Sequence, residues 1–260
     1  MKQPLAYVHP DAKIADNVVI EPFVSIDRDV VICEGTRIGS GVTILPGTRI
    51  GKNCNIFPGA VIGAIPQDLK FRGEYTTVEI GDNNTIREMV TLNRGTASKG
   101  KTVIGNNNLL MAYVHVAHDC IIGSNIILGN NTQLAGEVVV DDWAIVSAMS
   151  GIHQFCHVGS HVMIGGGSLV RKDVPPFIKA SREPLSYVGI NSIGLRRRNV
   201  SNDKIREIQD IYRYIYQKGL NTTQAIEIIE AEMPASQERD EILLFIKDSK
   251  RGIIHGYLPD

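Results

Sequence analysis

The chain has 260 residues, enough for one large domain or a large domain with a small one, and 43% of them are hydrophobic. Its formal net charge of -1 gives the molecule as a whole no attraction to nucleic acid or to an anionic membrane. Residues 1–6 hold no apolar signal-sequence core, and no stretch approaches ~18 consecutive apolar residues. The composition therefore predicts a soluble, cytoplasmic protein without a membrane span.

A six-residue repeat dominates the first two thirds of the chain. In steps of six from Val8 to Val170, 25 of the 28 positions are Val, Ile or Leu, and the exceptions are Asp68, Glu74 and Ser98. This period fits neither the about 3.6 residues of a helical turn nor the alternation of a strand. It is typical of a parallel β-helix, in which each hexad is a short strand plus a turn and its aliphatic residue points into a continuous core.

The positions between the aliphatic residues also fit this fold. Gly and Asn recur just after the aliphatic position, and both tolerate the left-handed backbone conformation that sharp corners need. Cys54, Cys120 and Cys156 stand four places after it, where Ala, Val, Thr and Ser otherwise occur. We expect these cysteines to be reduced, buried packing residues and not metal ligands or nucleophiles.

Two segments interrupt the repeat, residues 63–78 and 93–103, and the pattern predicts that both are loops extruded from the coil. Loops carried by a rigid scaffold often hold functional residues. The first contains Gln67-Asp68-Leu69-Lys70, and the second is small, basic and contains glycine. Plain solvated insertions are the alternative.

The repeat stops near residue 175, and the pattern that follows is helical. Capping residues and apolar periodicity predict a first helix that begins at Ser201 or Asn202, a second at Thr222 or Thr223, and a third at Ser236. The sequence thus predicts a β-helix domain over residues 1–175 and a helical domain over residues 176–260.

These features together resemble the hexapeptide-repeat acyltransferases. Coils in that class contain three hexads and wind left-handed, an exception to the usual crossover rule. The resemblance implies a mainly β protein, a left-handed parallel β-helix with a C-terminal α-helical domain.

The densest polar cluster is His115-Val116-Ala117-His118-Asp119-Cys120. Histidine suits general-base catalysis because its pKa of about 6.5 lies close to working pH. In a coil of three hexads, His118, Gly136 and Gln154 would stack in successive coils about 4.8 Å apart. Acyl transfer needs such a proton acceptor beside a donor for the developing oxyanion. A satisfied structural histidine is the alternative.

A second histidine group, His153, His157 and His161, has the i, i+4, i+8 spacing that would suggest a metal site on a helix. In hexads these residues take different places in the repeat, so we expect no intrachain metal site. Trimeric β-helices such as the gamma-class carbonic anhydrases assemble zinc between subunits, and that remains a minor alternative.

The order of motifs is similar to that of one family, the UDP-N-acetylglucosamine O-acyltransferases, which perform the first step of lipid A synthesis. The resemblance covers nearly the whole chain, and the motifs are specific only in combination. The matching segments are Pro66-Gln67-Asp68-Leu69-Lys70, Asn107-Asn108-Leu109-Leu110-Met111, Ala117-His118-Asp119-Cys120, Leu134-Ala135-Gly136, His153-Gln154-Phe155-Cys156, Asp173-Val174-Pro175-Pro176 and Gly194-Leu195-Arg196-Arg197-Arg198.

The resemblance implies a role for each matching residue. His118 would be the general base, with Asp119 as its partner, and the Gly136 amide would polarise the thioester carbonyl. Because adjacent strand residues point to opposite faces, the sequence alone does not place Asp119 against His118. Gly166 matches the position that limits acyl length, so a glycine there implies a long chain. The other implied substrate contacts are Asp68, Lys70, His115, His153 and Gln154, with Asn191, Arg197 and Arg198 at the ribose and diphosphate.

Two residues depart from the family pattern. Glu137 stands where many relatives have His, and Ile193 stands where many have Glu near the diphosphate. Both positions concern the acceptor, so a sugar with a 3-amine in place of the 3-hydroxyl remains an alternative.

The resemblance also implies partners. The acyl group would be carried as a thioester of acyl carrier protein, which is acidic. Residues 171–206 hold nine Lys or Arg against three acidic residues, so this segment would attract such a partner. The alternative for Arg196–Arg198 is a solvated helix face. Members of this class are homotrimers with active sites between subunits, and they use no metal or other cofactor.

Other functions make distinct predictions. A sugar N-acetyltransferase would prefer acetyl-CoA to acyl carrier protein, and a carbonic anhydrase would carry stoichiometric zinc. An ice-binding surface would show flat, regular Thr arrays, which the sequence lacks, and two loops interrupt the repeat that a structural rod would continue.

Overall fold

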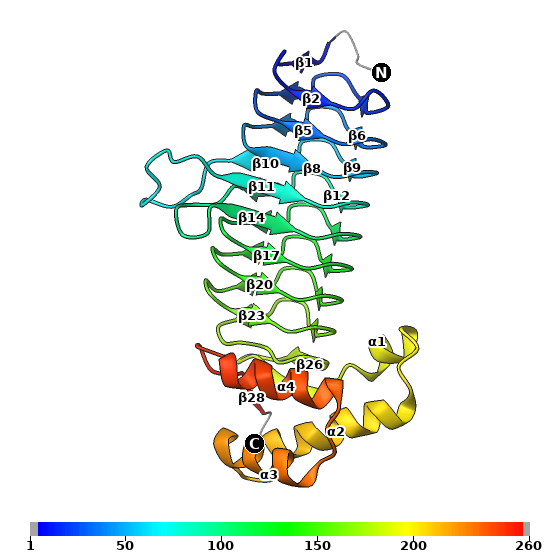
Figure 1. The fold of residues 1–260 in the computed structure, drawn as a ribbon, viewed down its shortest axis with the longest axis vertical. Coiled ribbons are helices and arrows are strands. Elements are labelled where there is room, and N and C mark those ends of the chain that lie inside the picture. The colour runs from blue at the N-terminus through cyan, green and yellow to red at the C-terminus, as the bar shows by residue number, and fades with distance from the viewer. Residues whose placement is uncertain (1–4, 257–260) are drawn as a thin grey trace.

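The computed structural model describes residues 5–256. Residues 1–4, part of the amino-terminal segment without a signal-sequence core, and residues 257–260 lie outside the described residues. The chain winds as a three-sided stack of coils, and the helices gather at its carboxyl-terminal end (Figure 1). Each side is one sheet, and all strand pairs are parallel except the pair β26 and β27.

The first sheet carries the candidate site. Its nine strands, in spatial order, are β1 (Tyr7–Val8), β4 (Ser25–Ile26), β7 (Thr43–Ile44), β10 (Val61–Ala64), β13 (Thr91–Asn93), β16 (His115–Val116), β19 (Gln133–Leu134), β22 (Gly151–Ile152) and β25 (Leu169–Val170).

The other two sheets complete each coil. The second sheet consists of β2 (Lys13–Ile14), β5 (Val31–Ile32), β8 (Thr48–Ile50), β11 (Thr77–Ile80), β14 (Lys101–Ile104), β17 (Ile121–Ile122), β20 (Val139–Val140) and β23 (His157–Val158). The third consists of β3 (Val19–Ile20), β6 (Arg37–Ile38), β9 (Asn55–Ile56), β12 (Thr85–Ile86), β15 (Leu109–Leu110), β18 (Ile127–Leu128), β21 (Ile145–Val146), β24 (Met163–Ile164), β26 (Ile178–Ser181), β27 (Ser186–Ile190) and β28 (His255–Gly256).

Three columns of turns connect the sheets. We call the turns from the first sheet to the second the first corner, those from the second to the third the second corner, and those from the third to the first the third corner. Eighteen residues separate paired positions in uninterrupted coils, as in the pair His115 and Gln133. The coil length implied by the resemblance is therefore confirmed.

The aliphatic residues of the repeat form the core of the stack. From Ile20 to Val170 they are at most 4% exposed, whereas Val8 and Ile14 in the first coil are only partly buried. Burying one such side chain contributes about 1.5–3 kcal/mol. The predicted buried cysteines are confirmed as well, and burial raises the pKa of Cys120 to about 12 and that of Cys156 to about 11. These thiols are protonated and unreactive.

Both predicted loops leave the coil at the first corner. Val61 pairs with Thr91, 30 residues further on, and Thr91 pairs with His115, 24 residues further on. Compared with an 18-residue coil, the first insertion adds 12 residues and the second adds six. Because both lengths are multiples of six, the repeat keeps its phase across the loops.

Four helices follow the coils: α1 (Ser192–Arg197), α2 (Asn202–Tyr216), α3 (Thr222–Glu232) and α4 (Gln237–Asp248). The predicted caps Ser201 and Ser236 accept hydrogen bonds at the starts of α2 and α4, and α3 begins at Thr222 as predicted, with Asn221 as its cap. Helix α1 was not predicted. None of these helices in residues 5–256 has the length and apolarity that a membrane crossing requires.

Helix α2 joins the helical segment to the coils. Its buried face includes Ile208 and Tyr212, and the Tyr212 hydroxyl donates a 2.6 Å hydrogen bond to the carbonyl of Pro176. The division into domains at residue 175 stays a prediction, since β26 lies beyond it and still pairs with β24 in the third sheet.

Candidate active site

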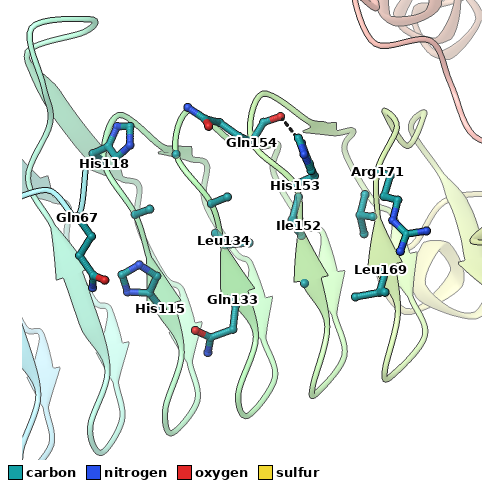
Figure 2. A pocket seen from close by; sticks show the side chains of 15 residues that line it. Gln67, His115, His118, Gln133, Leu134, Ile152, His153, Gln154, Leu169 and Arg171 are labelled. Carbon is teal, nitrogen blue, oxygen red and sulfur yellow. Dashed lines mark hydrogen bonds between the residues drawn. The ribbon is translucent and has the colours of Figure 1, made fainter. Parts of the chain in front are cut away.

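A groove of about 560 Å³ runs along the first sheet and its first corner. Its walls come from four successive coils, with His115 and Gln133 side by side on the strands and His118, His153 and Gln154 at the corner (Figure 2). Gln67 reaches the same groove from the first extruded loop. The structure thus brings together five of the predicted site residues: His115, His118, Gly136, His153 and Gln154.

His118, Gly136 and Gln154 occupy equivalent places in three successive turns of the first corner. The amide of Glu137 donates to the carbonyl of His118 at 2.9 Å, and that of Phe155 donates to the carbonyl of Gly136 at 3.2 Å. These bonds fix the register of the corner, so the predicted stacking of these three residues is confirmed.

Glycine at position 136 allows the His118 ring to lie directly against the backbone. A Cβ placed on Gly136 would be 2.5 Å from both Cε1 and Nε2 of His118, far inside van der Waals contact. In residues 5–256 no carbonyl or side chain accepts a hydrogen bond from the Gly136 amide. A proton acceptor and an unpaired amide donor therefore sit together at the wall of the groove.

Asp119 contacts His118 although the two are neighbours in sequence. Asp119 adopts a left-handed backbone conformation with φ of 60°, which breaks the strand alternation and turns both side chains the same way. Its Oδ2 lies 2.8 Å from Nδ1 of His118, and the residue is completely buried. An ionised Asp119 holds the proton on Nδ1, so Nε2 is left as the acceptor.

The environment of Asp119 favours the ionised form. Burial alone would raise the pKa of this carboxyl group, but hydrogen bonds from Thr96, His118 and Lys99 outweigh burial and lower the pKa. His115 behaves in the opposite way, because burial and then the neighbouring His118 lower its pKa and favour the neutral ring. Its Nδ1 lies 2.7 Å from the Thr91 hydroxyl.

The first loop places Asp68 opposite the histidine. Asp68 Oδ2 is 3.8 Å from Nε2 of His118, a separation too long for a hydrogen bond and open to a substrate hydroxyl. The amide of Lys70 donates to Asp68 at 2.9 Å, but the Lys70 side chain is exposed and does not line the groove.

The remaining predicted residues lie elsewhere in the same chain. Gly166 is in the third corner, where its Cβ position is 3.4 Å from the carbonyl of Ala148. Asn191 is buried at the start of α1, where it accepts from the Gly194 amide and donates to the carbonyl of His161. Arg197 is exposed on α1.

Arg198 lies at the second corner. Its guanidinium stacks over Trp143 at 5.0 Å, and it approaches Nδ1 of His161 at 3.3 Å and donates to the carbonyl of Trp143 at 3.1 Å. Burial and then the positive charge of Arg198 lower the pKa of His161 to about 4, so this imidazole is neutral and accepts the hydrogen bond. The geometry therefore separates Arg198 from His118 by one full side of the coil.

Sequence reasoning missed several residues that contact the site. Thr96 and Lys99 contact Asp119, and Ser98 donates a 3.2 Å hydrogen bond to Glu137, one of the two residues that depart from the family pattern. The only signal for them was the break in the repeat at residues 93–103.

The three spaced histidines do not converge. His153 is at the first corner, His157 is on β23 with Nε2 2.8 Å from Asp141, and His161 is at the second corner. Within the described part of the chain no group of three or more His, Cys, Asp or Glu side chains could hold a metal ion.

Comparisons with known proteins agree with this geometry. The family model described as Udp N-acetylglucosamine O-acyltransferase, Domain 2, matches residues 173–254, and the bacterial transferase hexapeptide model matches residues 29–64 and 101–136. The acyl-[acyl-carrier-protein]–UDP-N-acetylglucosamine O-acyltransferase of Thiobacillus denitrificans is 47% identical over 96% of this chain and 98% of its own length.

Solved structures extend the similarity to the whole fold. A UDP-N-acetylglucosamine acyltransferase from Bacteroides fragilis has a TM-score of 0.97 and 60% identity, covering 98% of this chain and all of its own. The Francisella novicida enzyme has a TM-score of 0.95 and 44% identity, covering 98% of this chain and 94% of its own.

The coils and the groove at their corner define a hexapeptide-repeat acyltransferase, and the predicted left-handed parallel β-helix with a C-terminal helical part is confirmed. The sequence identities of 47% and 60% with the Thiobacillus denitrificans and Bacteroides fragilis proteins, over nearly the whole chain, define the family more narrowly than the fold does. The chain belongs to the UDP-N-acetylglucosamine O-acyltransferase family.

Proposed function

We propose that this chain is an acyltransferase that moves a long 3-hydroxyacyl group from acyl carrier protein to the 3-hydroxyl of UDP-N-acetylglucosamine, the first step of lipid A synthesis. The names of its relatives support the donor and the acceptor. The observation that carries the chemistry is the placement of His118, whose Nδ1 is held by Asp119 while its Nε2 lies at the groove over Gly136.

In this mechanism Nε2 of His118 accepts the proton of the sugar 3-hydroxyl, and the hydroxyl oxygen attacks the thioester carbonyl carbon. The Gly136 amide donates to the oxyanion that forms. The intermediate then collapses, the carbon–sulfur bond breaks, and the proton passes from His118 to the leaving thiolate. Asp119 stabilises the imidazolium while it exists.

The substitution His118→Ala tests this assignment. Loss of the base lowers kcat by roughly 10²–10⁴-fold without changing the fold. The matched control is His9→Ala, which removes a partly buried histidine of the first coil, remote from the groove. The assay is mass spectrometry of products formed from the UDP-sugar and a panel of acyl carrier protein thioesters, and near-normal turnover of His118→Ala would remove the proposed base.

The same assay resolves the identity of the acceptor. We assign a hydroxyl acceptor, and not an amine, because the relatives are named as O-acyltransferases of UDP-N-acetylglucosamine. Glu137 is held by Ser98 at the edge of the first corner, where it can meet the acceptor. Faster acylation of the 3-amino UDP-sugar than of UDP-N-acetylglucosamine would show that this departure has changed the acceptor.

We further propose that the active enzyme is a homotrimer. His118 and Arg198 occupy different corners of one chain, so a nucleotide sugar that touches both must lie between two copies. Asn191 and Arg197 accompany Arg198 and would contact the ribose and diphosphate, while His153 and Gln154 belong with His118.

The donor side of the proposal rests on charge. Residues 171–206 have an excess of six positive charges, and Arg171 lines the groove itself. An acidic carrier protein would be attracted to this segment, and the attraction would weaken as salt rises. Because its donor is a carrier protein of the cell interior, we assign the enzyme to the cytoplasm.

A further inference from the structure

The second extruded loop closes over the carboxylate of Asp119. Oδ1 of Asp119 accepts from the backbone amides of Thr96 at 2.9 Å and Lys99 at 3.2 Å. Oδ2 accepts from the Thr96 hydroxyl at 2.6 Å and faces Nδ1 of His118 at 2.8 Å. The carboxylate thus has four hydrogen-bond partners, and three of them are donors from residues 96–99.

The direction of the Thr96 hydroxyl is set by its own environment. The amide of Ser98 donates to Oγ1 of Thr96 at 3.2 Å, which occupies a lone pair of that oxygen. The hydroxyl proton is therefore directed to Asp119. Thr96 is 7% exposed and Asp119 is completely buried, so this contact lies inside the protein.

The backbone of the second loop forms a tight turn that holds its hydrogen-bond donors toward the carboxylate of Asp119. The amide of Gly100 donates to the Thr96 carbonyl at 2.7 Å, which closes a tight turn over residues 96–100. Gly95 begins the turn, and a Cβ there would be 2.3 Å from the amide nitrogen of Lys101. The ammonium of Lys99 donates to the backbone carbonyl of Asp119 at 3.2 Å and so fixes the main chain as well.

Charged and titratable groups face this arrangement from several elements, and Glu74 of the first loop accepts a 3.0 Å hydrogen bond from the amide of Ala97. Asp68 faces the other side of the His118 ring at 3.8 Å, and His115 interacts electrostatically with His118 from the preceding strand. Lys99 lies on the loop itself, and Glu137 contacts the loop through Ser98.

We propose that Thr96 is a positioning residue for acyl transfer, because the loop over residues 94–100 fixes the orientation and the tautomer of His118 through Asp119. This inference rests on the proposed function, in which His118 is the base. It assigns a role to a loop that neither the repeat nor the core needs. Without the Thr96 hydroxyl, the carboxylate keeps its charge but loses one of the contacts that set its rotation.

The test compares Thr96→Val with Thr96→Ser in steady-state kinetics. Valine keeps the shape and removes the donor, so kcat falls about tenfold with KM for the UDP-sugar unchanged, as expected for one hydrogen bond to a charged group. Serine restores most of the rate. In Thr96→Val, more negative charge remains on Oδ2 facing the imidazole, so the acidic limb of the kcat/KM profile moves to higher pH.

Thr36→Val is the matched control. Thr36 is buried, donates a 2.9 Å hydrogen bond to the Gly51 carbonyl and accepts from the Cys54 amide, but it lies in an early coil away from the groove. We expect this variant to lose stability while kcat and the pH profile stay at wild-type values. Circular dichroism and a thermal melt report folding for all variants.

The outcomes separate the inference from the proposed function. Wild-type kcat in Thr96→Val would overturn the role of Thr96, and so would a loss of rate with an unmoved acidic limb, since that result indicates a merely structural residue. If His118→Ala stays active, the proposed base fails, whatever Thr96 does. An inactive His118→Ala together with a wild-type Thr96→Val would leave the proposed function standing and remove this inference alone.

Discussion

The substitution Gly136→Ala tests how closely turnover depends on the position of the His118 ring. The added Cβ would be 2.5 Å from Cε1 and Nε2, whereas ordinary contacts begin at 3.4 Å. The backbone of Gly136 is not in the left-handed region, so alanine fits the main chain and the ring must retreat, by about 0.9 Å. A displacement of about 1 Å can cost 10²-fold in rate, so we expect kcat to fall about 10²-fold.

The assay is steady-state turnover with acyl carrier protein thioester and UDP-sugar, together with a thermal melt. Alanine keeps the backbone amide, so the loss reports the ring position and not the oxyanion donor. The control is Gly39→Ala, whose Cβ would be 2.9 Å from the Ile56 carbonyl in a coil remote from the groove. It lowers the melting temperature and spares kcat. Near wild-type kcat in Gly136→Ala would refute the claim that the ring must lie against this glycine.

Three further predictions concern the chain length, the assembly and the response to acid. Gly166→Met leaves the fold intact, because a Cβ at this position makes only ordinary contacts. It shifts the preferred acyl chain to shorter lengths in a competition assay, and an unchanged product spectrum would contradict the role of Gly166 in limiting acyl length. Mixing unfolded His118→Ala and Arg198→Ala chains and refolding them together restores activity, because one site in a mixed trimer combines both intact residues; no recovery from correctly assembled trimers would count against sites between chains. Because the pKa of His161 is about 4 in the fold and 6.5 in the unfolded chain, the unfolded state binds more protons between these values, so stability falls as pH drops through this window. The His161 ring stacks on Trp143 and on Phe177. His161→Phe keeps this stacking and flattens the pH dependence of stability in denaturant titrations, whereas an unaltered slope would show that His161 is not its source.

Much of the fold followed from the sequence because one physical requirement repeats in every hexad. An inward aliphatic residue from Ile20 to Val170 must be buried, and a corner residue such as Asn107 must accept the left-handed conformation. The glycines that directly follow the aliphatic residue were expected to do the same, but apart from Gly63 they are not left-handed. To predict the stack of His118, Gly136 and Gln154, only the number of residues per coil was needed in addition to the repeat. These features are local or periodic, and a sequence displays such features directly.

The parts that could not be predicted depend on contacts without a period. Asp119 contacts His118 because the φ angle of Asp119 is positive. The alternation of side chains along a strand would instead place the two residues on opposite faces. Thr96 reaches Asp119 only after its loop folds back over the corner. The place of Arg198 is set by packing against Trp143, which follows from how the helical segment docks and not from any spacing.

The two extruded loops have lengths that keep the aliphatic residues of the stack in phase. Since 12 and six residues are whole numbers of hexads, the inward residues still pair across each loop, Ile62 with Leu92 and Leu92 with Val116, although the register shifts by a bulge after Ile62. Selection can therefore rebuild these loops, and with them the surroundings of His118, while every aliphatic ladder of the coil stays in register. A new acceptor preference can therefore evolve in this fold without any change in the buried core of the coils.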